Sequence, residues 1–80
     1  MAAGKGDKLS QYELADCYQN GYGVEMNHAK AFKWFQRSAE HGEKDAQNSL
    51  GYCYQFGLGV DVNYLEAIKW YRKVETIIII

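Results

Sequence analysis

Two glycine pairs are the first residues in this chain whose type and spacing suggest chemistry. Gly21-Tyr22-Gly23 and Gly57-Leu58-Gly59 resemble part of a phosphate-binding loop. A dinucleotide-binding fingerprint also needs a preceding strand and a third glycine three residues further on, where this sequence has Met26 and Val62. We therefore interpret both pairs as turn glycines and predict no phosphate ligand.

Two cysteines and two histidines offer a disulfide or a metal site. Cys17 and Cys53 lie at equivalent places in an internal repeat. Such positions on stacked helices are about 9–10 Å apart, whereas a disulfide needs Cα atoms within about 7 Å. His28 and His41 provide none of the paired spacing that zinc sites use. We expect buried free thiols, no metal and no cofactor.

Tryptophans and a basic ladder raise the possibility of nucleic-acid binding. Trp34 and Trp70 could stack on bases, but they share a stripe with Ala31 and Ala67, which favours core packing. Four cations follow the same helices: Lys33, Arg37, Lys69 and Lys73. A net charge of -1 creates no long-range attraction for phosphates, and such a ladder is typical of a solvated helix face. No His, Cys or Ser has a recognisable nucleophile setting, so we expect no enzyme.

An internal repeat determines which elements position these residues. Residues 14–24 return as residues 50–60, an offset of 36 positions. A fixed period of a few tens of residues indicates a stacked repeat architecture. The signature positions are Leu14, Tyr18, Gly21, Gly23, Ala31 and Trp34 in the first copy and Leu50, Tyr54, Gly57, Gly59, Ala67 and Trp70 in the second.

Each copy has the pattern of two helices. The first helix shows the spacing i, i+3, i+4, i+7 at Leu14, Cys17, Tyr18 and Gly21. The second helix has an apolar stripe at Ala31, Trp34, Phe35, Ser38 and Ala39. Gly21 and Gly42 are expected to end these helices, and Asn27 to cap the second one. In the second copy, Asn63 with Glu66 resembles a capping box.

The pattern predicts an all-α protein of one small domain. We expect residues 1–9 to be the end of a preceding repeat, residues 10–45 the first full repeat, and residues 46–80 the second. The second copy lacks the terminal glycine and ends in an apolar tail, residues 77–80. Two repeats are fewer than the roughly three that usually give a stable array, so we expect marginal stability or self-association.

With L-x-x-C-Y-x-x-G-x-G-V followed by A-x-K-W-[FY]-x-[KR], the chain resembles the Sel-one-like repeat family. The resemblance covers residues 6–75 and implies a right-handed, tetratricopeptide-like α-solenoid that acts as an adaptor or scaffold. It also implies that the first helix of each repeat lines a concave, partner-binding face. The residues expected there are Tyr12, Asp16, Gln19, Asn48, Tyr52, Gln55 and Phe56, with Leu9, Asn20 and Asp45 beside them.

We therefore predict a protein–protein interaction module with Tyr12 and Tyr52 as its main anchors, because tyrosine is enriched at binding hot spots. Two alternatives remain open: a structural spacer or self-association end, and a hydrolase of the disulfide-rich repeat type. The sequence has no secretory signal, and the run at residues 77–80 is too short to span a bilayer. An intracellular protein with no membrane or nucleic-acid partner is expected.

Overall fold

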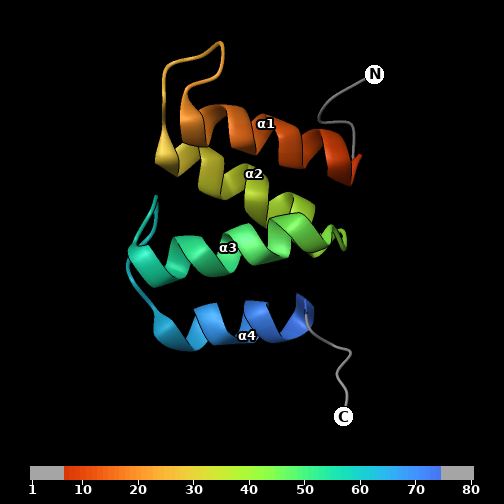
Figure 1. Cartoon of the computed structure of the whole chain (residues 1–80), viewed down its shortest axis with the longest axis vertical. Coiled ribbons are helices and arrows are strands. Elements are labelled where there is room, and N and C mark those ends of the chain that lie inside the picture. Colours follow the sequence, from red (N-terminus) through yellow and green to blue (C-terminus); the bar gives the residue numbers. More distant parts are fainter. Residues whose placement is uncertain (1–6, 75–80) are drawn as a thin grey trace.

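The computed structural model describes residues 7–74, which form four α-helices (Figure 1). These are α1 (Lys8–Asn20), α2 (His28–Glu40), α3 (Lys44–Phe56) and α4 (Tyr64–Val74). Each helix runs antiparallel to the previous one, and neighbours pack in chain order along the long axis. Residues 7–74 contain no strand, and the arrangement confirms the predicted all-α helical-repeat solenoid. The predicted apolar tail lies outside the described residues.

The loops after α1 and α3 repeat one another closely. Gly21 and Gly57 adopt left-handed φ angles of 73° and 70°, which confirms the predicted helix ends. Asn27 N–H donates to the Tyr18 carbonyl at 2.8 Å, and the equivalent bond in the second loop has the same length. The repeated sequence thus produces the same turn twice.

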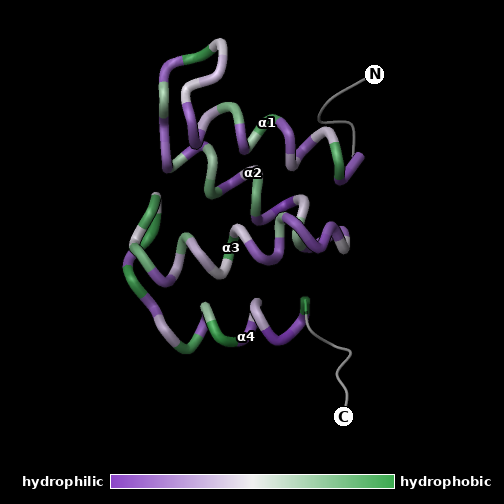
Figure 2. Tube along the Cα trace, viewed as in Figure 1, coloured by the Kyte–Doolittle hydropathy of each residue, from purple (hydrophilic) through white to green (hydrophobic). Residues whose placement is uncertain are grey.

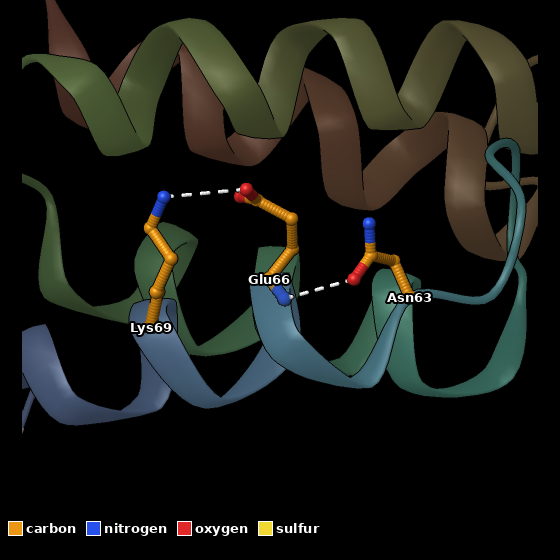
Figure 3. A network of polar contacts seen from close by, with 3 residues as sticks. All are labelled: Asn63, Glu66 and Lys69. Carbon is orange, nitrogen blue, oxygen red and sulfur yellow. Dashed lines mark hydrogen bonds and ion pairs between the residues drawn. The ribbon is translucent and has the colours of Figure 1, made fainter.

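Asparagine caps begin the second helix of each repeat. Asn27 accepts a hydrogen bond from the Lys30 N–H at 3.0 Å, as predicted, and Asn63 accepts one from the Glu66 N–H at 3.1 Å (Figure 3). The reciprocal half of a capping box does not form, because the Asn63 N–H already donates to a carbonyl of α3. The Glu66 carboxylate instead pairs with Lys69 at 3.3 Å.

The core lies around the contact of α2 with its neighbours. It is made of small residues and two large ones, and its members are Ala15, Ala31, Phe35, Ala39, Ala46, Leu50 and Cys53. Phe35 and Leu50 are its largest side chains and are essentially inaccessible to solvent. The α2 stripe was therefore predicted correctly at Ala31, Phe35 and Ala39.

The buried face of α1 differs from the predicted stripe. Gln11 and Ala15 are the buried residues of α1, whereas Leu14, Cys17 and Tyr18 are only half-buried. Within residues 7–74, α1 packs chiefly on α2, so the opposite side of its stripe has no covering helix. The equivalent stripe in α3 is buried at Leu50 because α3 lies between α2 and α4.

The tryptophans are also more exposed than predicted. Trp34 and Trp70 pack against the core on one side but remain half-buried. On the other side, Arg37 lies 4.9 Å from the Trp34 ring centre and Lys73 lies 5.4 Å from that of Trp70. Each indole therefore packs on the core and also makes a cation–π contact with a basic side chain of its own helix.

Candidate functional site

The outward face of α3 presents the largest set of exposed side chains that were predicted to bind a partner. Successive helical residues are about 100° apart, which places this set opposite Ala46, Leu50 and Cys53. We call it the α3 surface, and its members are Asp45, Asn48, Tyr52, Gln55 and Phe56, all of them exposed. Five polar or aromatic side chains on one helix face form a surface that is available to a partner.

Two aromatic rings in tilted contact form the centre of the α3 surface. Tyr52 and Phe56 are one helical turn apart, and their ring centres are 4.6 Å apart at an interplanar angle of 53°. The exposed fractions of the two residues are 49% and 54%. Their mutual contact restricts both side chains while leaving half of each accessible. The pair can therefore receive an apolar group with little further ordering.

Tyr71 of α4 supports this surface from the side. Its hydroxyl donates to Gln55 Oε1 at 2.8 Å. Its ring crosses Gly51 so closely that a Cβ at Gly51 would lie 2.8 Å from the ring. Burial, and next the neighbouring Tyr52, raise the pKa of Tyr71. Tyr71 was not predicted to join this surface, because it lies on the second helix of its repeat, where its equivalent is Phe35.

The α1 residues are placed in two different ways. Tyr12 is half-buried, with its ring centre 5.9 Å from that of Phe35. Burial, followed by the carboxylates of Asp16 and of Asp45 on α3, raises the pKa of Tyr12. Gln19, in contrast, faces α2 and contacts His28 Nδ1 through its Oε1 at 3.3 Å. Of these, Tyr12 joins the α3 surface and Gln19 belongs to the contact between α1 and α2.

The remaining α1 candidates lie at the edge of this region. Asp16 is half-buried and accepts a hydrogen bond from the Asn20 side chain at 2.9 Å. Leu9, near the start of α1, is 50% exposed. His41 Nδ1 contacts Gln11 Oε1 at 3.1 Å, so both histidines pair with a glutamine of α1. Residues 7–74 contain no group of three or more potential metal ligands and no enclosed pocket.

Charge separates the two kinds of helix. The first helices, α1 and α3, hold the acidic residues Glu13, Asp16 and Asp45, and their lysines are at their first residues, Lys8 and Lys44. The second helices, α2 and α4, hold the exposed cations Lys30, Lys33, Arg37, Lys69, Arg72 and Lys73 against Glu40 and Glu66. The α3 surface therefore lies on the pair of helices that lacks the excess of positive charge.

The two cysteines are free thiols in the described part of the chain. Cys53 is buried as expected, and this burial raises the pKa of its thiol to about 11. Cys17 is only half-buried, which corrects the expectation of two buried thiols. The difference has the same cause as the exposure of Leu14, because both lie on the side of α1 that no described helix covers.

The raised pKa of Cys53 makes stability dependent on alkaline pH. Because the folded thiol keeps its proton up to about pH 11 while the unfolded thiol loses it near 9.0, the unfolded state gains stability in this window. We expect the free energy of unfolding to fall by about 1.4 kcal/mol between pH 8 and pH 10. Urea unfolding at both pH values measures the loss. Cys53→Ala should remove this contribution from the measured loss and Cys17→Ala should not; equal losses in both variants would contradict the assignment.

The fold and its repeated turns define a class of protein, the α-helical repeat proteins of helix–turn–helix units. Within this class, the Sel1 repeat profile matches residues 8–43 and residues 44–73. The chain therefore belongs to the Sel1 repeat family, whose members are generally protein–protein interaction modules. None of the described helices has the length and apolar character needed to cross a membrane.

Solved structures and a curated relative agree with this family. A Sel1 repeat protein from Oxalobacter formigenes is 38% identical with a TM-score of 0.85, over 88% of this chain and 29% of that one. A protective antigen of uropathogenic Escherichia coli strains with an SLR fold is 36% identical with a TM-score of 0.90, over 92% of this chain and 16% of that one. DAP3-binding cell death enhancer 1 from Rattus norvegicus is 44% identical over 39 residues, which is 49% of this chain and 8% of that protein. The chain thus spans less than a third of each of these proteins.

Proposed function

We propose that this chain binds a segment of a partner protein on the α3 surface, with an apolar side chain of the partner seated on Tyr52 and Phe56. The observation that carries the proposal is the contact between these two rings, whose centres are 4.6 Å apart while about half of each residue stays accessible. Covering one aliphatic or aromatic partner side chain contributes about 1.5–3 kcal/mol. The pair is already ordered, so most of this energy is available for binding.

The polar neighbours of the pair suggest how a partner is oriented. Asn48 and Gln55 present side-chain amides that can bond the backbone of a bound segment. The Tyr71 hydroxyl donates to Gln55 Oε1, which leaves the amide N–H groups of Gln55 free to donate to a partner carbonyl. Asp45 and Asp16 give this side a negative charge. The preferred partner segment therefore combines one large apolar residue with a nearby lysine or arginine.

The family and one relative support a binding role at the coarser level. Sel1 repeats are generally protein-interaction modules, and the relative from rat is named for binding another protein, DAP3. Tyr12 contributes to our proposal as a support for the surface, because its ring packs on Phe35. Tyr52 and Phe56 are therefore better anchors to test than Tyr12, whose removal would also disturb the core.

Peptides selected against the purified chain from a random phage-displayed library provide a direct test. We expect the strongest peptide to bind about 10–30 times more weakly to Tyr52→Ala and to Phe56→Ala, because each change removes a central aromatic contact. Fluorescence anisotropy with the labelled peptide gives the Kd. Tyr22→Ala is the matched control, since Tyr22 is 60% exposed in the α1–α2 loop and should change the Kd less than twofold. Recovery of no binding peptide, or equal Kd values for the parent and both anchor variants, would refute the proposal.

A further inference from the structure

The two repeats meet through one interface, and each half of it occurs again at an end of the described fold. In the interface, Phe32 of α2 packs edge-on against Tyr54 of α3, with ring centres 5.4 Å apart at 89°. Phe35 of α2 is 1% exposed and shares the core with Ala46, Leu50 and Cys53 of α3. α2 thus provides one half of the contact and α3 the other. At the repeat offset of 36 residues, the α2 residues of this interface have equivalents on α4, and the α3 residues have equivalents on α1.

The half carried by α4 is not covered by any described residue. We call it the α4 face, and its members are the exposed residues Tyr64, Leu65 and Ile68. Ile68 occupies the place of Phe32 and is 49% exposed, and Leu65 is 76% exposed. The equivalents of Tyr64 and Leu65 are His28 and Ala29, so this end is more apolar than its internal counterpart (Figure 2). The α4 face thus lacks the polar character of the outer face of a capping repeat.

The half carried by α1 is the complementary one. We call it the α1 face, and it consists of Leu14, Cys17, Tyr18 and Gly23. Leu14 and Cys17 are half-buried, whereas their equivalents Leu50 and Cys53 are 0% exposed in the internal interface. The α4 face and the α1 face are therefore equivalent to the two sides of the internal interface, and they lie at opposite ends of the described fold.

A pair of glycines provides an independent sign of what covers the α1 face. Gly59 approaches α2 so closely that a Cβ there would lie 2.2 Å from the His28 carbonyl oxygen. Gly23, its equivalent, has a similar φ of 74°, but nothing among the described residues lies within 4 Å of a Cβ built on it. The space beside Gly23 matches the space that the α2 backbone fills beside Gly59. The start of α4 is equivalent to the start of α2, so the start of an α4 helix would fit the space beside Gly23.

We propose that a second copy of this chain stacks head to tail, with its α1 face on the α4 face of the first and Tyr18 of one copy against Ile68 of the other. In this contact, α4 of one copy packs on α1 of the next as α2 packs on α3 within one copy. The loop at Gly23 would approach the start of α4 as the loop at Gly59 approaches the start of α2. It is heterologous, so each added copy presents a new α4 face and growth continues. The stacking also places α1 of the second copy beside the α3 surface of the first, although it does not depend on partner binding there.

Two variants block one face each and leave the other intact. Ile68→Glu places a charge on the α4 face at an exposed position, so a single copy tolerates it. Gly23→Asn adds a side chain that is accommodated in a single copy, because asparagine tolerates left-handed φ and the site is open. In the stack, the same side chain would collide with the start of the other copy's α4. Circular dichroism checks that both variants remain helical.

Light scattering of the 80-residue chain over a hundredfold concentration range measures assembly. We expect the weight-average mass of the parent to rise at least twofold, and each variant alone to stay at the 9.2 kDa of one chain. An equimolar mixture of the variants should reach twice that mass and stop, because only one intact pair of faces remains. A parent that stays at 9.2 kDa throughout would overturn the proposal. So would a Gly23→Asn variant whose mass still rises with concentration.

Discussion

Gly59→Asn is expected to lower the free energy of unfolding by about 2–3 kcal/mol more than Gly23→Asn does. Both glycines have nearly the same φ, 77° and 74°, and both follow the first helix of a repeat. The conformational cost of asparagine is therefore small and nearly equal at the two sites. The difference arises because a side chain at Gly59 meets the His28 carbonyl and the Ala29 N–H, which are backbone groups and cannot rotate away.

Urea unfolding at a protein concentration low enough to keep single copies measures the two changes. The α3–α4 loop must move away from α2 to admit the new side chain, and the repeat interface loses packing with it. A domain of this size has a total stability of only roughly 4–12 kcal/mol, so the Gly59 variant should show a clearly lower midpoint. Equal midpoints for the two variants would show that the approach of Gly59 to His28 does not constrain the fold.

Much of the fold was predictable because the repeat signals are local. Gly21 and Gly57 end helices through their own backbone freedom, and Asn27 caps through its own side chain, so each is visible in a few residues. The N-terminal caps Asp7 and Glu43 were missed, although both side chains accept hydrogen bonds from backbone N–H groups two residues on. Their signal was local as well, but neither precedes an obvious apolar run.

The burial of α1 could not be predicted, because it depends on neighbours and not on periodicity. The repeat identifies Leu14 and Leu50 as the same position, and only the packing shows that one is half-buried and the other is not. Gln11 is 2% exposed and pairs with His41, which lies 30 residues away in the chain. No periodic rule marks a polar residue as buried when its partner comes from another helix.

The candidate surface was predictable in part for a similar reason. The helical wheel of α3 places Asn48, Tyr52 and Gln55 away from the apolar stripe, and the structure has all three exposed. Tyr71 was invisible to that wheel because it reaches Gln55 from α4. That these residues bind a partner remains a prediction, since exposure shows that a surface is available and not what it holds.

Leu50→Ala should cost about 3–5 kcal/mol of stability, whereas Leu14→Ala should cost only about 1–2 kcal/mol. The two leucines are the same position of two repeats, so helix propensity and local sequence change alike. Leu50 is 0% exposed, and its truncation leaves a cavity between α2 and α3. Leu14 is half-buried, and solvent fills the space that its side chain leaves.

Urea midpoints for the two variants at low protein concentration give the comparison, and equal losses would mean that the α1 face is as well packed as the interior. The same pair also reports on stacking. If a second copy covers the α1 face, Leu14 becomes buried in the assembled chain as Leu50 is in the single one, and the cost of Leu14→Ala should rise with protein concentration. The cost of Leu50→Ala should not follow that rise, because the cavity that it leaves lies inside one copy.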